Sequence, residues 1–235
     1  MHIRHIKIIA FLSALVLVCR AAAGCGRVDA TTEGFAEASA AESTAQPADT
    51  AEETAESTEE EPAILPQEAI AALPLEEGAP RVVEAFLSLY RSCDPQASQY
   101  LHQAATLDYP ALQAEIAKNI RFTVGETSLV QKDGETAYAA VKVDIDSAGF
   151  QAAYEAVEKE LTEKTDSAEA LKMLTEKLGS ADAEQMHFEI EVMVLDYVTS
   201  QEIVMTPELT DALTGGLRSY LQQLEEGESS EETVG

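Results

Sequence analysis

Residues 132–146 read KDGETAYAAVKVDID, and this stretch decides the fold. Asp133-Gly134 is a turn dipeptide that typically joins two antiparallel strands in a tight hairpin. Apolar and polar side chains then alternate, as they do in a strand with one buried face. The inward set is Ala137, Ala139, Val141, Val143 and Ile145. The stretch therefore predicts a hairpin whose second strand covers a core with one face only.

The sequence also predicts the first strand of this hairpin and two strands beyond it. Ile120, Phe122 and Val124 alternate before the turn, and Leu129-Val130 fall out of phase after Gly125, which indicates a β-bulge. Residues 186–198 form a long strand, and residues 202–205 a short one. The apolar face of the long strand carries Phe188, Ile190, Val192 and Val194.

Helical spacing of apolar residues appears before, between and after these strands. Two helices are expected between the hairpin and the long strand, divided near residues 165–167, and Gly215-Gly216 should end or kink the last helix. The expected helix starts are Pro80, Asp94-Pro95, Asp108 to Pro110, Ser147 and Pro207. The fold class is therefore α+β, with a curved antiparallel sheet packed on N-terminal helices and a helical insertion between strands.

The chain begins with an export signal. Arg4 and Lys7 precede an apolar run over residues 8–19, which is too short to span a bilayer. Ala22-Ala23-Gly24-Cys25 follows and resembles the lipobox of bacterial lipoproteins. The resemblance implies cleavage after residue 24, lipid such as palmitate on Cys25, and a location on the extracytoplasmic face of the cell membrane. An ordinary secretory signal and an uncleaved anchor are the alternatives.

Composition divides the remaining chain into three parts. Residues 25–66 are low-complexity, acidic and poor in apolar bulk, and they are interpreted as a disordered tether. Residues 67–224 have the length of one domain, and residues 225–235 form an acidic tail that is expected to be disordered. The formal net charge is −28, which excludes nucleic acid as a partner, because nucleic-acid binding needs a basic surface.

Several segments resemble the small extracytoplasmic lipoproteins that carry a nuclear-transport-factor-2-like domain, a cystatin-like roll. They are Val82-Val83-Glu84-Ala85-Phe86-Leu87, Ala139-Ala140-Val141-Lys142-Val143-Asp144-Ile145, and Glu208-Leu209-Thr210-Asp211-Ala212-Leu213 with Gly215-Gly216. The resemblance implies a sheet that encloses a cone-shaped pocket. Members of the wider superfamily use this pocket as enzymes, as ligand binders or as assembly modules. The fold therefore leaves the function open.

Four residues are candidates for lining such a pocket: His102, Asp108, Tyr138 and His187. His102 with Asp108 and Tyr109 suggests an acid–base pair, although Asp108 is better explained as a helix N-cap. His187, Glu189 and Glu191 share one strand face, which suggests either a metal or acid–base site or a solvated strand face. We interpret this face as solvated, and no catalytic, cofactor or metal site is predicted.

The leading functional interpretation is a membrane-anchored, non-enzymatic binding or interaction module of the cell envelope. Its partner would be a small apolar ligand, a peptide or another protein. One alternative is an enzyme of the roll fold that uses a His/Asp pair in the pocket. The other is a structural homodimer formed through the open sheet face near Met193, Leu195 and Tyr197.

Overall fold

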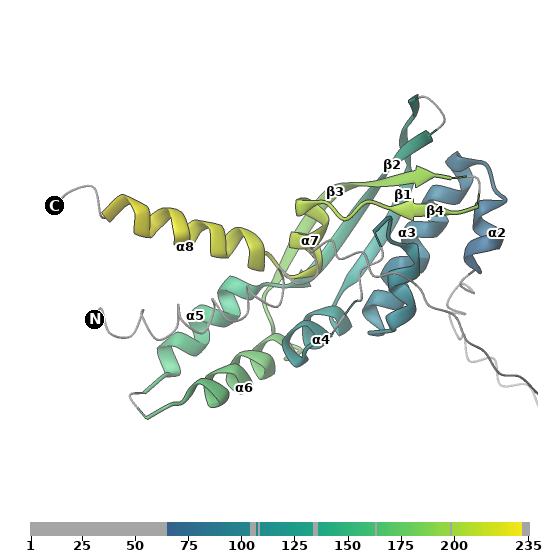
Figure 1. Cartoon of the computed structure of the whole chain (residues 1–235). Coiled ribbons are helices and arrows are strands. Elements are labelled where there is room, and N and C mark those ends of the chain that lie inside the picture. Colours follow the sequence, from purple (N-terminus) through teal and green to yellow (C-terminus); the bar gives the residue numbers. More distant parts are fainter. Residues whose placement is uncertain are drawn as a thin grey trace, which may run out of the picture.

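Four antiparallel strands form one sheet in the order β1-β2-β3-β4 (Figure 1). The computed structural model describes residues 65–103, 107, 109–133, 136–162, 164–197 and 199–231. The strands are β1 (Arg121–Asp133), β2 (Thr136–Ala148), β3 (Gln185–Asp196) and β4 (Gln201–Ile203). The sheet is open, curved and combined with helices, which confirms the α+β class.

The period-two pattern places the side chains of β2 and β3 as predicted. Val141 lies opposite Val192 and Val143 opposite Ile190 on the inner face of the sheet. The residues between them, such as Lys142 and Glu191, lie on the outer face. Asp133 pairs with Thr136, so the predicted hairpin closes across residues 134–135, which lie outside the described residues.

The bulge predicted after Gly125 is present on β1. Val124 pairs with Val143, but Thr127 pairs with Val141, and the register shifts again between Thr127 and Leu129. At both shifts β1 carries an extra residue relative to β2, which bends the strand.

Among the described residues, four helical segments precede the sheet. They are α2 (Gln67–Ala71), α3 (Leu75–Arg91), the 3-10 helix η1 (Pro95–Tyr100) and α4 (Ala111–Lys118). Asp94 caps η1 by accepting from the Gln96 backbone N–H at 2.8 Å, as the Asp-Pro pair predicted. The predicted start at Pro80 is wrong, because α3 begins at Leu75 and contains Pro80.

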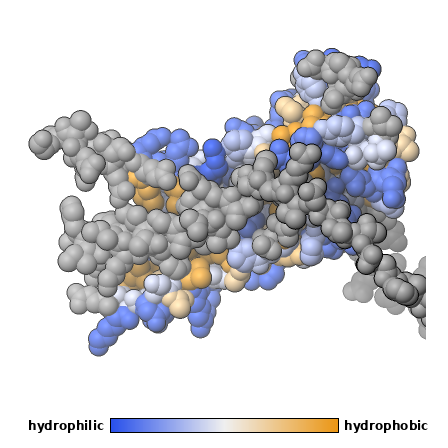
Figure 2. Space-filling model, in the orientation of Figure 1, coloured by the Kyte–Doolittle hydropathy of each residue, from blue (hydrophilic) through white to orange (hydrophobic). Residues whose placement is uncertain are grey.

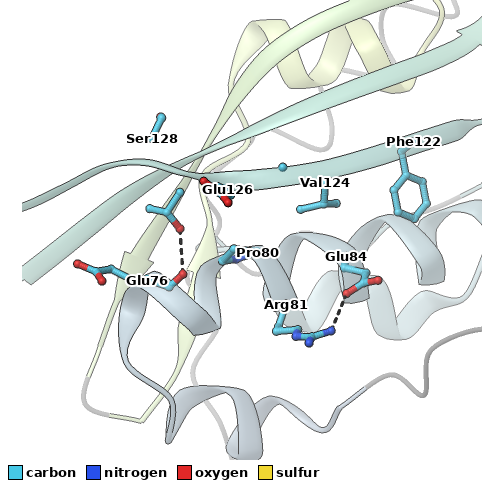
Figure 3. Close-up of a pocket in the computed structure, with 10 residues that line it drawn as sticks. Glu76, Pro80, Arg81, Glu84, Phe122, Val124, Glu126 and Ser128 are labelled. Carbon is cyan, nitrogen blue, oxygen red and sulfur yellow. Dashed lines mark hydrogen bonds and ion pairs between the residues drawn. The ribbon is translucent and has the colours of Figure 1, made fainter.

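Proline is tolerated inside α3 because another residue replaces its missing donor. A residue at position 80 would normally donate its backbone N–H to the Glu76 carbonyl, and proline has no such group. The Thr127 hydroxyl of β1 donates to that carbonyl at 3.0 Å. The same hydrogen bond ties α3 to the bulged part of β1 (Figure 3).

The main core lies between α3 and the inner face of the sheet. Val82, Val83 and Phe86 on α3 are fully buried, and so are Val141 and Ile145 on β2. Complete burial of side chains of this size contributes about 1.5–3 kcal/mol each. This layer fixes where α3 lies on the sheet.

A second core joins the helices at the other end of the sheet. The insertion between β2 and β3 forms α5 (Phe150–Glu160) and α6 (Ser167–Leu178), divided where the sequence predicted. The predicted helix start at Ser147 is wrong, because β2 continues to Ala148. Phe150, Leu174 and Leu178 pack there with Ile116 of α4. Figure 1 shows α5, α6 and α8 at this end, on the opposite side of the molecule from α2.

The final helical segment divides at the glycine pair. Helix α7 (Pro207–Leu213) ends before Gly215 and Gly216, which have φ angles of 63° and 80°, and α8 (Leu217–Glu231) follows. These angles favour glycine, and a Cβ at Gly215 would collide with the Ala148 carbonyl. The α8 backbone continues to Glu231, further than the apolar pattern predicted. In the described ranges, we find no helix with the length and apolar character of a membrane span.

The replacement of the missing proline donor by Thr127 is testable by a double-mutant cycle. We expect Thr127→Val to lower the free energy of unfolding by about 0.5–1 kcal/mol, because the Glu76 carbonyl loses its donor. Pro80→Ala supplies a backbone N–H, so Thr127→Val should cost less than half as much in that background. Urea denaturation of the full chain measures both values, with Thr127→Ser as the control that keeps the hydroxyl. Equal costs in the two backgrounds would contradict the assignment.

Candidate functional site

An open groove runs between α3 and the edge strand β1 (Figure 3). Its volume is about 940 Å³. Glu76, Pro80, Arg81 and Glu84 line it from α3, and Phe122, Val124, Gly125, Glu126, Thr127 and Ser128 line it from β1. The groove exists because α3 covers the inner face of the sheet while the bulged edge of β1 stands beside it.

The groove has an apolar floor. Figure 3 shows Phe122 and Val124 pointing from β1 toward α3, with Val124 on the side of Pro80 and Phe122 on the side of Glu84. The guanidinium of Arg91 lies 5.7 Å from the centre of the Phe122 ring, which is a cation–π distance. Phe122 and Val124 are only partly buried, so apolar surface remains open to a ligand.

The rim of the groove is acidic. Glu76, Glu84 and Glu126 contribute three carboxylates, and Arg81 contributes one guanidinium. Arg81 Nη1 lies 3.3 Å from Glu84 Oε2, so this cation is paired within the rim. The remaining charge is negative and favours a ligand that carries positive groups.

The structure places His102 in a polar contact that the sequence did not predict. His102 Nδ1 lies 3.3 Å from Glu202 Oε2 and 3.0 Å from the Tyr197 hydroxyl. Asp108, its expected partner, lies outside the described residues. Tyr109 instead donates its hydroxyl to the Asp94 carbonyl at 3.3 Å, and burial raises the pKa of Tyr109 to about 12.

His187 and Tyr138 lie on the outer face of the sheet. His187 Nδ1 is 2.8 Å from Asp146 Oδ1 across the β2–β3 pair, and Tyr138 donates its hydroxyl to Gln131 on β1. His102, Tyr138 and His187 are not among the residues that line the groove. The structure therefore does not gather the described pocket candidates in one place.

The open sheet face also carries the surface predicted for a homodimer. Met193 is 39% exposed, while Leu195 and Tyr197 are partly buried. Figure 2 shows apolar surface among hydrophilic residues on the part of the molecule where β2 and β3 lie in Figure 1. The homodimer stays a prediction. Cys25, the expected lipid attachment site, lies outside the described residues.

Sequence reasoning missed the groove. Arg81, Glu84 and Glu126 look like ordinary solvated positions when each is taken alone. Two local signals pointed toward the region, namely Pro80 within helical spacing and the phase change after Gly125. Neither signal specifies that α3 and β1 lie side by side, because only the shared core determines that arrangement.

Comparisons of the chain with known protein families, with curated proteins and with solved structures found no match.

The His187–Asp146 contact predicts a measurable titration. The hydrogen bond to Asp146 raises the pKa of His187 above 6.5, and the nearby charges of Asp144 and Glu189 add to this shift. A raised folded-state pKa stabilises the fold below pH 6.5, and this contribution is lost as pH rises through the folded-state pKa.

We expect Asp146→Asn to lower the pKa of His187, as followed by NMR of the His187 ring in the full chain. Glu202→Gln is the matched control, because it removes a carboxylate beside the other described histidine, His102. The assignment would fail if Asp146→Asn left the His187 titration unchanged.

Proposed function

We propose that this protein is a lipid-anchored lipoprotein of the extracytoplasmic membrane face that binds a basic, extended segment of a partner protein. The observation that carries the proposal is the α3–β1 groove, with its apolar floor and acidic rim. The export signal and Cys25 support the location, and residues 25–66 would connect the anchor to the domain.

Charge complementarity selects the chemistry of the partner. Glu76 and Glu126 stand on opposite walls of the groove, and Arg81 is already paired with Glu84. A segment that alternates basic and apolar residues would place cations at the rim and apolar side chains on Phe122 and Val124. Such a segment would be extended, with side chains that alternate in the same way as those of β1.

The free edge of β1 supports recognition of an extended backbone. In the described part of the chain, β1 pairs with β2 on one side, and its other side faces the groove. Outward backbone groups of an edge strand bind an added strand. The two bulges limit such pairing to short stretches of β1, so side-chain contacts in the groove would carry most of the specificity.

The resemblance to the nuclear-transport-factor-2-like lipoproteins enters as part of this proposal. An α+β fold, an open curved antiparallel sheet and the three quoted segments support a cone-shaped roll. In that roll, N-terminal helices would pack within the curve of the sheet. The ligand would then bind at the edge of the roll, between α3 and β1, rather than deep inside it.

Peptide binding tests the groove. We expect a fluorescein-labelled peptide of alternating lysine and valine to bind the full chain in detergent micelles, with the affinity measured by fluorescence anisotropy. The double variant Glu76→Lys/Glu126→Lys should weaken binding by about tenfold, because two attractive charges become repulsive. A peptide of alternating glutamate and valine should not bind.

A matched variant separates groove binding from general attraction to an acidic protein. Glu169→Lys/Glu184→Lys makes the same change in net charge away from the groove and should change the affinity by less than about twofold. Equal losses in the two double variants would contradict groove binding.

Lipid attachment is tested separately. A bacterial host that expresses the full chain and is fed an alkyne analogue of palmitate should label the protein, because the Cys25 thiol accepts the lipid. Cys25→Ser should abolish the label and release the protein from the membrane, whereas Cys93→Ser should leave both unchanged. Label that persists in Cys25→Ser would rule out the lipoprotein assignment without affecting the groove.

A further inference from the structure

The outer face of the β2–β3 pair brings four ionisable side chains together. Asp144 lies directly opposite Glu189, and Asp146 lies directly opposite His187. All four point to the same side of the sheet, because they alternate along their strands. This group lies on β2 and β3, away from the residues that line the groove, and it is independent of the proposed function.

Asp146 orients the ring of His187. Its carboxylate lies 2.8 Å from Nδ1, and this contact places the ring proton on Nδ1 when the histidine is neutral. The lone pair of Nε2 then faces the rest of the group, with Glu189 Oε1 at 3.8 Å. A carboxylate that orients a histidine through its second nitrogen is the usual arrangement behind a metal-binding imidazole.

Asp144 and Glu189 form a like-charge pair on the outer face of the sheet. Carboxylates directly opposite each other on paired strands destabilise a sheet. Glu191 faces Lys142 and Asp146 faces Arg121, so these two carboxylates have basic cross-strand neighbours. Asp144 lies between Thr123 on β1 and Glu189 on β3. A cation held between Asp144 and Glu189 would turn their repulsion into attraction.

We propose that Asp144, His187 and Glu189 bind a divalent transition-metal ion, with Zn²⁺ as the best match, and that Asp146 is the positioning residue. One ligand atom from each of the three residues lies within 4.8 Å of the others. Donors around a tetrahedral zinc ion stand about 3.4 Å apart, given bond lengths of about 2.0–2.1 Å. The side chains of His187 and Glu189 are 55% and 82% exposed, so small rotations close the difference.

The donor set selects the metal class. One imidazole nitrogen and two carboxylates suit Zn²⁺ and similar ions, whereas Ca²⁺ and Mg²⁺ favour sites made only of oxygen ligands. Three protein ligands leave one tetrahedral position for water.

His102 provides a matched comparison within the same chain. It is also an exposed histidine beside a carboxylate, with Nδ1 at 3.3 Å from Glu202 Oε2. Its ring also contacts the Tyr197 hydroxyl, and among the described residues only the Glu202 carboxylate lies within ion-pair distance of it. A general tendency of surface histidines to bind zinc would affect His102 and His187 alike, but the proposed site requires His187 alone.

Isothermal titration with Zn²⁺ tests the site in the full chain in detergent micelles, after the thiols have been alkylated with N-ethylmaleimide. We expect saturable binding that His187→Gln, Asp144→Asn and Glu189→Gln each weaken by about tenfold or more. His102→Gln should change the affinity by less than about twofold. NMR should show zinc-dependent shifts of the His187 ring and none of the His102 ring.

Asp146→Asn tests the positioning role. We expect it to weaken Zn²⁺ binding by about 10–100-fold. In the absence of metal it should also lower the share of the Nδ1–H tautomer of His187, read from ring ¹⁵N shifts, which a merely structural role would not change. Circular dichroism of each variant checks that the substitution leaves the fold intact.

Three results would overturn the proposal. They are the absence of saturable Zn²⁺ binding below about 1 mM, wild-type affinity in both His187→Gln and Glu189→Gln, and equal losses in His102→Gln and His187→Gln. Weak, unsaturated binding that all variants share would show diffuse attraction to an acidic chain, and it would also count against the site.

Discussion

Burial of one face of the sheet beneath α3 is the constraint on which the rest of the structure depends. Val82 and Phe86 on the helix and Val141 and Ile145 on β2 are completely buried in this layer. The hydrophobic contribution of these side chains is large enough to set the position of α3 on the sheet.

The same constraint explains why the polar residues of β2 and β3 lie together. A period of two gives each inward apolar residue an outward neighbour, so Asp144 and Asp146 face outward because Val143 and Ile145 face inward. The register of β2 against β3 then brings His187 opposite Asp146. A shift of one residue would place these charges in the core, so the apolar face fixes the register that assembles the outer group.

The groove arises where this regular packing ends. β1 is an edge strand, and its bulges bend it. As a result, α3 covers only part of β1. The Thr127 hydroxyl bridges the two elements by satisfying the Glu76 carbonyl that Pro80 leaves without a backbone donor. One interruption in a helix and one in a strand thus meet at the same place, and they leave an apolar floor between acidic walls.

The sequence by itself determined the local structure. Alternation in residues 137–145, the Asp94-Pro95 cap and the glycine pair each act within a few residues, and each is found where it was predicted. The start of α3 was predicted wrongly, because the rule against proline inside a helix cannot foresee a donor on another strand. The same limit applies to His102, whose contacts with Glu202 and Tyr197 come from residues distant in the chain.

Tertiary structure alone decided which of these pieces became neighbours. The groove joins residues 76–84 to residues 122–128, and the outer group joins residues 144–146 to residues 187–189. The two halves of each set are far apart in the sequence, and no sequence motif links them. Side chains that are unremarkable in sequence acquire a common environment only when a buried core fixes helix position and strand register. That core is a sum of many non-local contacts, which no short window of sequence contains.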